Sequence, residues 1–425
     1  MLEQFVAVMP GTLAPALLIM CLSVMLTVGE GKDKPISSHW RLWGFILGTI
    51  AAIVFATLRA TAVINQRTFV NQPVLTVAVV VDLLAIAAVI ASPWIVKDWR
   101  KHAIWMHLAN AVSAIAIALT LFYALPDVIL QLTIWVEPDA PVFTSDMLLR
   151  ALGFLLGLAM SAIVALIFRT MRSTAVRISF TVASVLMMAI LFIQHATGLL
   201  QMIQAHSLYF PRFLFQPLVF SINHNQQMIM VQALVFAIPA VASMIAGFRM
   251  TTKPEPGVNE ATVRRHKAFR RHAIASAVWS LVAMIGVTLT LTVGVSATTQ
   301  QITLSPPEDY SLKDGVATIT FAQVEDGHLH RFEYKAKDGT EMRFIIIKKN
   351  GGAYGIGLDA CENCGDAGYY EKDGKIICKK CEVAINLATI GFKGGCNPIP
   401  FPFKMGGGKI TIQTADLDAL SAHFQ

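Results

Sequence analysis

Charged residues are scarce in this sequence. Only 14% of its 425 residues are Asp, Glu, Lys or Arg, whereas soluble domains contain about 25%. Hydrophobic residues make up 55% of the chain, and the mean hydropathy is +0.58. This composition excludes a single soluble core, a disordered chain and a small disulfide-dense scaffold. It predicts a polytopic α-helical membrane protein with an attached domain.

Motifs of nucleotide-dependent and acyl-transfer enzymes are also missing. The sequence has no Gly-Lys-Ser/Thr loop of the Walker type and no Gly-x-Ser-x-Gly elbow. The basic segment 264–271 precedes an apolar stretch, so we interpret it as the positive flank of a membrane span. The net charge of +7 therefore indicates membrane orientation and contact with the lipid bilayer, and we expect no nucleic-acid partner.

Eight apolar stretches reach the roughly 20 residues that a helix needs to cross a bilayer. They run over 5–28, 41–63, 73–96, 104–125, 147–168, 178–199, 227–248 and 273–297. We predict an eight-helix transmembrane domain over 1–299, whose first helix is retained because its leader lacks positive charge. Beyond residue 300 no apolar run is this long, and 14 of the 34 Lys and Arg residues lie there. Residues 300–425 are therefore predicted to form a separate domain.

The distribution of Lys and Arg predicts the orientation of the helices. One set of alternating loops contains 16 of these residues and the other set contains 4. The first set comprises 29–41, 96–103, 169–177 and 249–272, and the second comprises 59–72, 126–150 and 200–226. Since positive residues stay on the cytoplasmic side, both termini are predicted to face outward.

The domain 300–425 is predicted to be small and mostly β. Short β-branched or aromatic runs alternate in it with Gly- and Asp-containing turns. The predicted strands cover 315–321, 328–334, 342–348, 353–358 and 409–413. A further hairpin is predicted between 365 and 377.

Five of the six cysteines lie in this domain. The pairs Cys361-x2-Cys364 and Cys378-x2-Cys381 are separated by 13 residues. A Cys-x2-Cys turn directs two sulfurs to one point, and two such turns joined by a hairpin form a tetrahedral four-sulfur site. The paired motif therefore predicts a metal knuckle that holds zinc, iron or an iron–sulfur cluster.

Alternatives to this interpretation involve the same residues and their neighbours. In an oxidising outward compartment the pairs would form two disulfides, or one pair would act as a thiol–disulfide redox couple. Cys396, 14 residues after the second pair, is a candidate fifth ligand, replacement ligand or free thiol. His328 and His330 share one face of a predicted strand. They are candidates for binding a divalent or cuprous ion or for sharing the cysteine site, and the alternative is a solvated edge strand.

Four motifs of this domain occur in a recognisable order. They are His328-x-His330-x-Phe332-x-Tyr334, Asp359-Ala360-Cys361-Glu362-Asn363-Cys364, Cys378-x2-Cys381 and Gly394-Gly395-Cys396-Asn397-Pro398. In this order the domain resembles the FtrD-like membrane iron–sulfur protein family. The resemblance implies an iron–sulfur cluster or Cys-ligated iron held by the four paired cysteines, with Cys396 as an accessory candidate and zinc or copper as alternatives.

The same resemblance implies a cellular setting. Proteins of this family are associated with the bacterial inner membrane and with high-affinity iron uptake, where they are thought to handle electrons for the iron redox step. The implied partners are an iron permease and periplasmic iron- and copper-binding proteins. The domain 300–425 is then expected on the periplasmic side.

Ionisable residues within the spans need partners, because a lone charge in hydrocarbon is costly. Arg59 and Asp82 lie on consecutive antiparallel spans at depths that differ by about 7 Å, so we predict an Arg59–Asp82 ion pair; the alternative is a proton or ion path. His195, His206 and His224 are predicted at the outer surface as a polar site, and a haem held by these histidines is a further alternative.

These observations lead to three functional hypotheses. The first is a membrane redox protein that supports metal uptake, an electron-transfer protein rather than an enzyme that converts a substrate. The second is a non-redox module that captures iron, copper or zinc and passes it to a transporter. The third is the transporter itself, against which the scarcity of charged residues in the spans argues.

Overall fold

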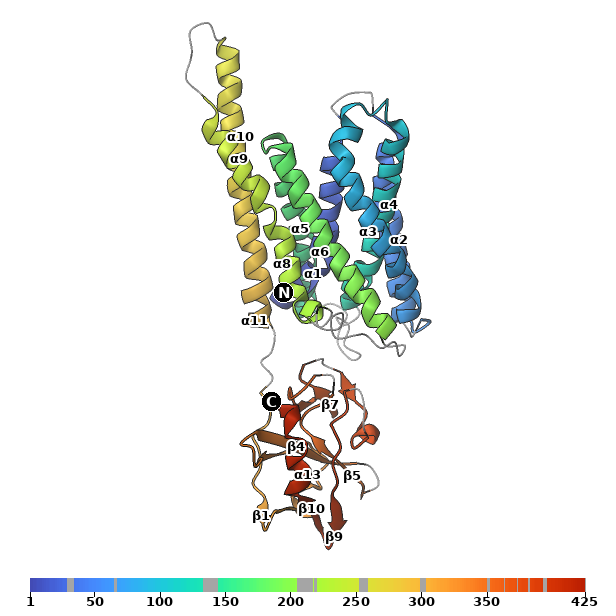
Figure 1. Ribbon diagram of the computed structural model, residues 1–425, viewed down its shortest axis with the longest axis vertical. Helices are drawn as coiled ribbons and strands as arrows, with labels where there is room; N and C mark the ends of the chain where they lie inside the picture. Colours follow the sequence, from blue (N-terminus) through green and yellow to red (C-terminus); the bar gives the residue numbers. More distant parts are fainter. Residues whose placement is uncertain are drawn as a thin grey trace. The chain divides into compact units, whose positions relative to one another are not determined.

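The computed structural model divides the chain into two compact units, Met1–Thr299 and Gln300–Gln425. We call them the membrane unit and the C-terminal unit (Figure 1). The structure describes all residues except 29–33, 65–66, 133–143, 205–216, 218–219, 252–258, 299–302, 350–351, 363, 373, 381–382, 393–395 and 425.

Within the described residues, the membrane unit has eight helices that are long and apolar enough to cross a membrane, which confirms the predicted number. Six are single helices: α1 (Leu2–Met25), α2 (Trp40–Ala60), α3 (Arg67–Lys97), α4 (Ala103–Leu130), α5 (Ser145–Thr170) and α6 (Arg177–Gln204). The seventh consists of α8 (Asn225–Leu234) and α9 (Ala237–Arg249). The eighth consists of α10 (Glu260–Leu289), a π turn (Thr290–Gly294) and α11 (Val295–Thr298).

The core of the membrane unit is built around α1. Its side chains Leu13, Leu17 and Leu18 are fully buried and pack with residues of the other helices in one large apolar cluster. The outer faces of the surrounding helices expose large apolar side chains such as Leu47 and Ile50 instead. An apolar exterior of this kind suits a hydrocarbon solvent. The backbone suits it as well, because a helix satisfies its own backbone hydrogen bonds.

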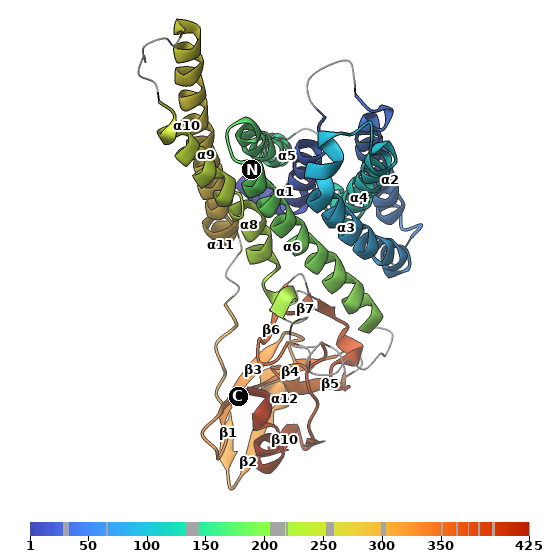
Figure 2. The ribbon, with the colours of Figure 1, turned by 45° about the horizontal axis from the view of Figure 1, so that its top comes forward.

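Helix α2 packs closely along α4, and the two run side by side in both ribbon views (Figures 1 and 2). The contact depends on Gly44 and Gly48, one turn apart on α2. A Cβ atom on Gly44 would lie 2.2 Å from the backbone oxygen of Ala114, and one on Gly48 would lie 2.6 Å from Cα of Ala118. Small residues spaced by four let membrane helices approach in this way.

This pairing overturns the predicted Arg59–Asp82 ion pair. Arg59 donates from Nη1 to Oδ1 of Asp127, at the end of α4, over 2.6 Å. Asp82 on α3 is bonded to His195 of α6 instead. The prediction was wrong because it assumed that consecutive spans pack together, whereas α2 takes α4 as its neighbour.

The C-terminal unit contains three antiparallel sheets, so the mostly-β prediction is confirmed. The first has the order β1 (Ser311–Lys313), β2 (Val316–Thr320), β10 (Lys409–Gln413), β9 (Lys404–Gly406). The second has the order β3 (His330–Lys335), β4 (Glu341–Lys348), β5 (Tyr354–Leu358), and the third β6 (Tyr369–Lys372), β7 (Lys375–Cys378), β8 (Ala384–Ile385). Phe332, Phe344 and Phe401 are at the centre of the main core, between the first two sheets and the short helix α13 (Thr414–Asp418).

Candidate metal centre

Three cysteine side chains of the C-terminal unit converge. The Sγ atoms of Cys361, Cys364 and Cys378 all lie within 4.8 Å of one another, although the third comes from a separate segment. Cys381, the predicted fourth ligand, lies outside the described residues. No disulfide joins the five cysteines that the structure describes. The arrangement offers three thiol sulfurs to a single ion or cluster.

The first cysteine pair forms a tight turn. Cys361 and Gly365 exchange two backbone hydrogen bonds of 3.0 Å, and the turn requires a φ of +69° at Gly365, which glycine adopts without strain. The backbone N–H of Cys364 donates to Sγ of Cys361 over 3.2 Å. Hydrogen bonds to sulfur stabilise thiolate charge and tune the potential of a bound cluster.

The third thiol is presented by the β6–β7 hairpin. Cys378 ends β7 and pairs in register with Tyr369 of β6. Its backbone N–H donates to the carbonyl of Val383 over 3.1 Å, which closes the turn after β7. The predicted hairpin between 365 and 377 corresponds to these two strands.

A buried charge cluster connects the two segments. The Asp359 carboxylate, fully buried two residues before Cys361, accepts from Nε of Arg331 at 2.8 Å and from Nε of Arg343 at 3.1 Å. It also accepts from the backbone N–H of Tyr369 at 2.8 Å. Arg331 is 1% exposed and additionally donates to the Tyr369 carbonyl. Asp359 therefore fixes the first cysteine turn relative to the strand that faces Cys378.

Asp359 belongs to one of the sequence motifs, but no role was predicted for it or for Arg331. The one available signal was an Arg and an Asp placed within or beside apolar strand patterns, where an unpaired charge would be costly. Which partner each would take depends on the packing of sheets that are distant in sequence.

Tyr369 closes one side of the group of thiols. Its hydroxyl donates to the carbonyl of Cys396 over 2.7 Å. Burial, and then the neighbouring thiols of Cys361 and Cys378, raise the pKa of Tyr369, so it stays a neutral donor. Cys396 packs against the apolar cluster that contains Cys361, Cys378 and Tyr369. Its sulfur is not among the three that converge in the described part of the chain.

The two histidines of the predicted strand have carboxylate partners. Nδ1 of His328, which precedes β3, lies 3.0 Å from Oε1 of Glu371. His330 lies between two carboxylates, with Nδ1 2.8 Å from Glu308 and Nε2 2.8 Å from Asp326. Both nitrogens can bond to carboxylates only in the protonated ring, which has no lone pair for a metal.

Burial lowers the pKa of His330, but the hydrogen bonds to Asp326 and Glu308 outweigh burial and raise it. Among the described residues, neither His328 nor His330 belongs to the group of ligand atoms that converges at the cysteines.

The membrane histidines are placed differently from one another. His195 is 2% exposed, and its Nδ1 lies 2.7 Å from Oδ2 of Asp82. Nδ1 of His224 lies 2.9 Å from the carbonyl of Phe220 in its own turn, and His206 lies outside the described residues. A haem at these positions stays a prediction.

The donors of the cysteine group fit a soft metal site. Three sulfurs within 4.8 Å suit zinc, cuprous copper, iron or an iron–sulfur cluster. Cys361 and Cys378 are buried in an apolar cluster with Ile345, Ile376 and Ile390, and Cys364 is partly exposed at its edge. Such a surround limits solvent access to the sulfurs, which is one way in which proteins tune a redox centre.

Comparison with known proteins gives a match to a family model. Residues 324–424 match the family model described as membrane iron-sulfur containing protein FtrD-like. This confirms the resemblance predicted from the sequence, over a segment that includes all the converging cysteines and Cys396. Searches of curated proteins and of solved structures found no match to the chain.

Proposed function

We propose that this protein is a membrane-anchored metal redox protein that assists iron uptake. The observation that carries the proposal is the convergence of Cys361, Cys364 and Cys378 within the segment that matches a membrane iron–sulfur family. In this proposal Cys381 supplies the fourth sulfur, and the group holds an iron–sulfur cluster or a single Cys-ligated iron. When bound, such a centre supplies one-electron transfer to or from an iron-handling partner.

The chain's own residues hold and shield the centre. Asp359, with Arg331 and Arg343, fixes the first turn against β6, and the Cys364 amide stabilises charge on the Cys361 sulfur. Tyr369 and the surrounding isoleucines cover the buried side. The Cys364 side is the more open one, so we propose that a partner protein approaches there.

The proposed setting is the bacterial inner membrane, with the C-terminal unit on the periplasmic side. It is supported by the eight spans together with the concentration of Lys and Arg in one set of loops. The proposed partners are an iron permease and periplasmic iron- or copper-binding proteins.

Metal analysis of the full chain, purified without oxygen, tests this function. We expect iron in near-stoichiometric amount, visible absorbance and an electron paramagnetic resonance signal in one redox state. Cys378→Ser is expected to lose the iron and the signal. Cys21→Ala is the matched control, because Cys21 is buried in α1, and it is expected to keep both.

Two results would overturn the proposal. Zinc alone, without visible absorbance, would remove the redox role. Iron or copper that exchanges freely with added chelator would favour the second hypothesis, a metal-binding module that passes its ion to a transporter.

A further inference from the structure

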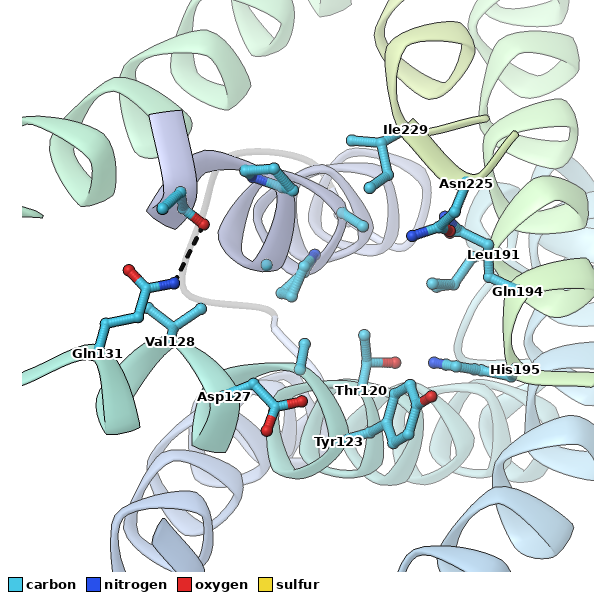
Figure 3. Close-up of a pocket in the computed structure, with 16 residues that line it drawn as sticks. Thr120, Tyr123, Asp127, Val128, Gln131, Leu191, Gln194, His195, Asn225 and Ile229 are labelled. Atoms are coloured by element: carbon cyan, nitrogen blue, oxygen red, sulfur yellow. Dashed lines mark hydrogen bonds between the residues drawn. The ribbon is translucent and has the colours of Figure 1, made fainter. Parts of the chain in front are cut away.

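The membrane unit contains a cavity that the proposed function does not use. It has a volume of about 300 Å³ and lies between α1, α4, α6 and α8 (Figure 3). His195, one of its lining residues, is nine residues from the end of α6, which places it about 14 Å along the helix from that end. Its bond partner Asp82 lies midway along the 31-residue helix α3, so this wall of the cavity lies at the depth of the middle of that helix.

A proton acceptor lies at one wall. The Asp82 carboxylate accepts from Nδ1–H of His195 over 2.7 Å, and both side chains are almost fully buried. This bond fixes the tautomer of the neutral ring, so Nε2 has the lone pair. Since His195 lines the cavity, that lone pair is available to a ligand there.

A hydroxyl without a partner lies opposite. Thr120 of α4 is 2% exposed, and within the described residues its Oγ1 has no hydrogen-bond partner. Figure 3 shows this oxygen and a ring nitrogen of His195 pointing toward each other across the cavity. A buried polar group without a partner is costly, so the pair implies a ligand atom that bonds to both. One that donates to Nε2 and accepts from Thr120 is a hydroxyl.

The rest of the lining is mixed, and the amide side chains of Gln131, Gln194 and Asn225 lie beside apolar ones. Pro10, Leu191 and Ile229 give apolar wall, and the Tyr123 ring packs edge-on against His195 with centroids 5.6 Å apart. The volume is about ten times the roughly 30 Å³ share of one water molecule. A mixed lining around a space of this size suits a ring that has both polar and apolar substituents.

The charges at the cavity do not favour an ion. Asp127, the lining carboxylate, is held by Arg59 at 2.6 Å and by Arg67 at 3.5 Å, and Asp82 lies behind His195 and is not among the described lining residues. Neither a metal cation nor an anionic lipid therefore meets an uncompensated charge among the described lining residues. A neutral, hydroxyl-bearing ring that is soluble in the bilayer fits best.

We propose that this cavity binds the ring of a membrane quinol, with one ring hydroxyl donating to Nε2 of His195 and accepting from the hydroxyl of Thr120. This goes beyond the proposed function, because it assigns a ligand to the membrane unit and does not depend on the metal centre.

Equilibrium binding of decyl-ubiquinol to the full chain in detergent, under anaerobic conditions, tests the proposal. We expect saturable binding with one site per chain. Thr120→Val removes only the hydroxyl and leaves no other group unpaired, so it is expected to weaken binding about tenfold. His195→Gln is expected to weaken it further. Thr76→Val is the matched control, since Thr76 is exposed on α3 and bonds only within its own helix, and it is expected to bind as the natural chain does.

A second ligand separates the ring hydroxyl from the ring. The quinol with both hydroxyls methylated keeps the shape but cannot donate, and it is expected to lose most of the affinity. Absence of binding to the natural chain, or binding that Thr120→Val leaves unchanged, would overturn the proposal and indicate a site filled by water. Iron content, measured on the same samples, reports on the metal centre alone, so failure of the quinol site and failure of the proposed function are distinguishable.

Discussion

In the described part of each unit one aspartate is buried, and the two have different hydrogen-bond donors. Asp359 of the C-terminal unit has two arginines and a backbone N–H as donors, whereas Asp82 of the membrane unit has one histidine. Arginine stays protonated at any physiological pH, so the Asp359 cluster has one charge state. His195 presents only Nδ1 to Asp82, so its second ring nitrogen is not used by this bond. The buried aspartate therefore joins two segments of the fold beside the thiols, and it orients a cavity-lining ring in the membrane unit.

The units also differ in whether their apolar side chains are exposed or buried. The membrane unit exposes rows of leucine, isoleucine and valine on its helices, and it buries serines such as Ser184, Ser243 and Ser280. In the described part of the C-terminal unit, the large exposed apolar side chains are Leu312, Val383, Phe392 and Met405. Lipid around one unit and water around the other account for the difference.

The largest loss of stability is expected from a change in the Asp359 cluster. Asp359→Asn leaves Arg331 buried without its counter-charge, which is expected to destabilise the C-terminal unit by about 3–5 kcal/mol. Hydrogen exchange at β6 in the full chain measures the loss, and iron content is expected to fall with it. Arg343→Gln is the control, because the Arg343 side chain is 28% exposed and its loss leaves the Arg331–Asp359 pair intact. Equal effects of the two changes would contradict the structural role of the buried Arg331–Asp359 pair.

The membrane pair is expected to give a smaller loss. Asp82→Asn replaces a charge-assisted hydrogen bond to His195 by a neutral one, at a cost of about 1.5–3 kcal/mol. Unfolding of the full chain in mixed micelles measures it. Asp127→Asn is the matched control, because Asp127 is 58% exposed and its ion pair with Arg59 is worth about 1 kcal/mol or less. A larger loss at Asp127 than at Asp82 would contradict the comparison.

The close approach of α2 and α4 is a further feature of the membrane unit. Substitutions of two glycines, one inside this contact and one outside it, can test it. Gly48→Ala would place Cβ 2.6 Å from Cα of Ala118 and is expected to destabilise the α2–α4 contact by about 1 kcal/mol or more. At Gly286 of α10 a Cβ meets nothing within 4 Å. Gly286→Ala is therefore expected to stabilise by about 0.5–1 kcal/mol, since alanine loses less entropy in a helix. Thermal unfolding in detergent measures both, and shifts of the same sign would argue against the packing.

Local patterns in the sequence predicted most of the elements. A run of 20 apolar residues identifies a membrane helix without knowledge of its neighbours, so eight spans could be predicted. Strand β10 was predicted with the bounds that it has, Lys409–Gln413, because alternation and turn residues are also local. The paired cysteine motif included the three thiols that converge in the described residues, Cys361, Cys364 and Cys378, because a Cys-x2-Cys turn directs its two sulfurs to one point. Its fourth predicted ligand, Cys381, stays a prediction.

Contacts between distant segments could not be predicted in this way. Asp82 and His195 are 113 residues apart in sequence, and their contact requires that α3 packs on α6. The break between α8 and α9 and the π turn at Thr290–Gly294 leave no interruption in the apolar pattern. The error on Arg59 has the same origin, because order along the chain does not determine which helices are neighbours.

The smallest expected effect on stability concerns His330, a histidine that is bonded to two carboxylates in the same unit as the Asp359 cluster. Its pKa is raised in the folded state above the ordinary value of 6.5, because bonds to Asp326 and Glu308 outweigh burial. A raised folded pKa contributes stability that is fully present below pH 6.5 and is lost as the pH rises through the folded value. The difference in opening free energy at β3 between the natural chain and His330→Gln should therefore be largest near pH 5.5 and shrink above neutrality.

Hydrogen exchange, corrected for the intrinsic pH dependence of amide exchange, measures this difference, and contributions from the thiols cancel because both chains carry them. His328→Gln is the control, since the His328 side chain is 69% exposed with one carboxylate partner, and its difference is expected to be smaller at each pH. A difference at His330 that grows with pH would mean that the ring is held neutral, in which case its second nitrogen would again be open to a metal. The direction of this small pH effect therefore decides whether the histidine belongs with the structural charges of the C-terminal unit or with its metal chemistry.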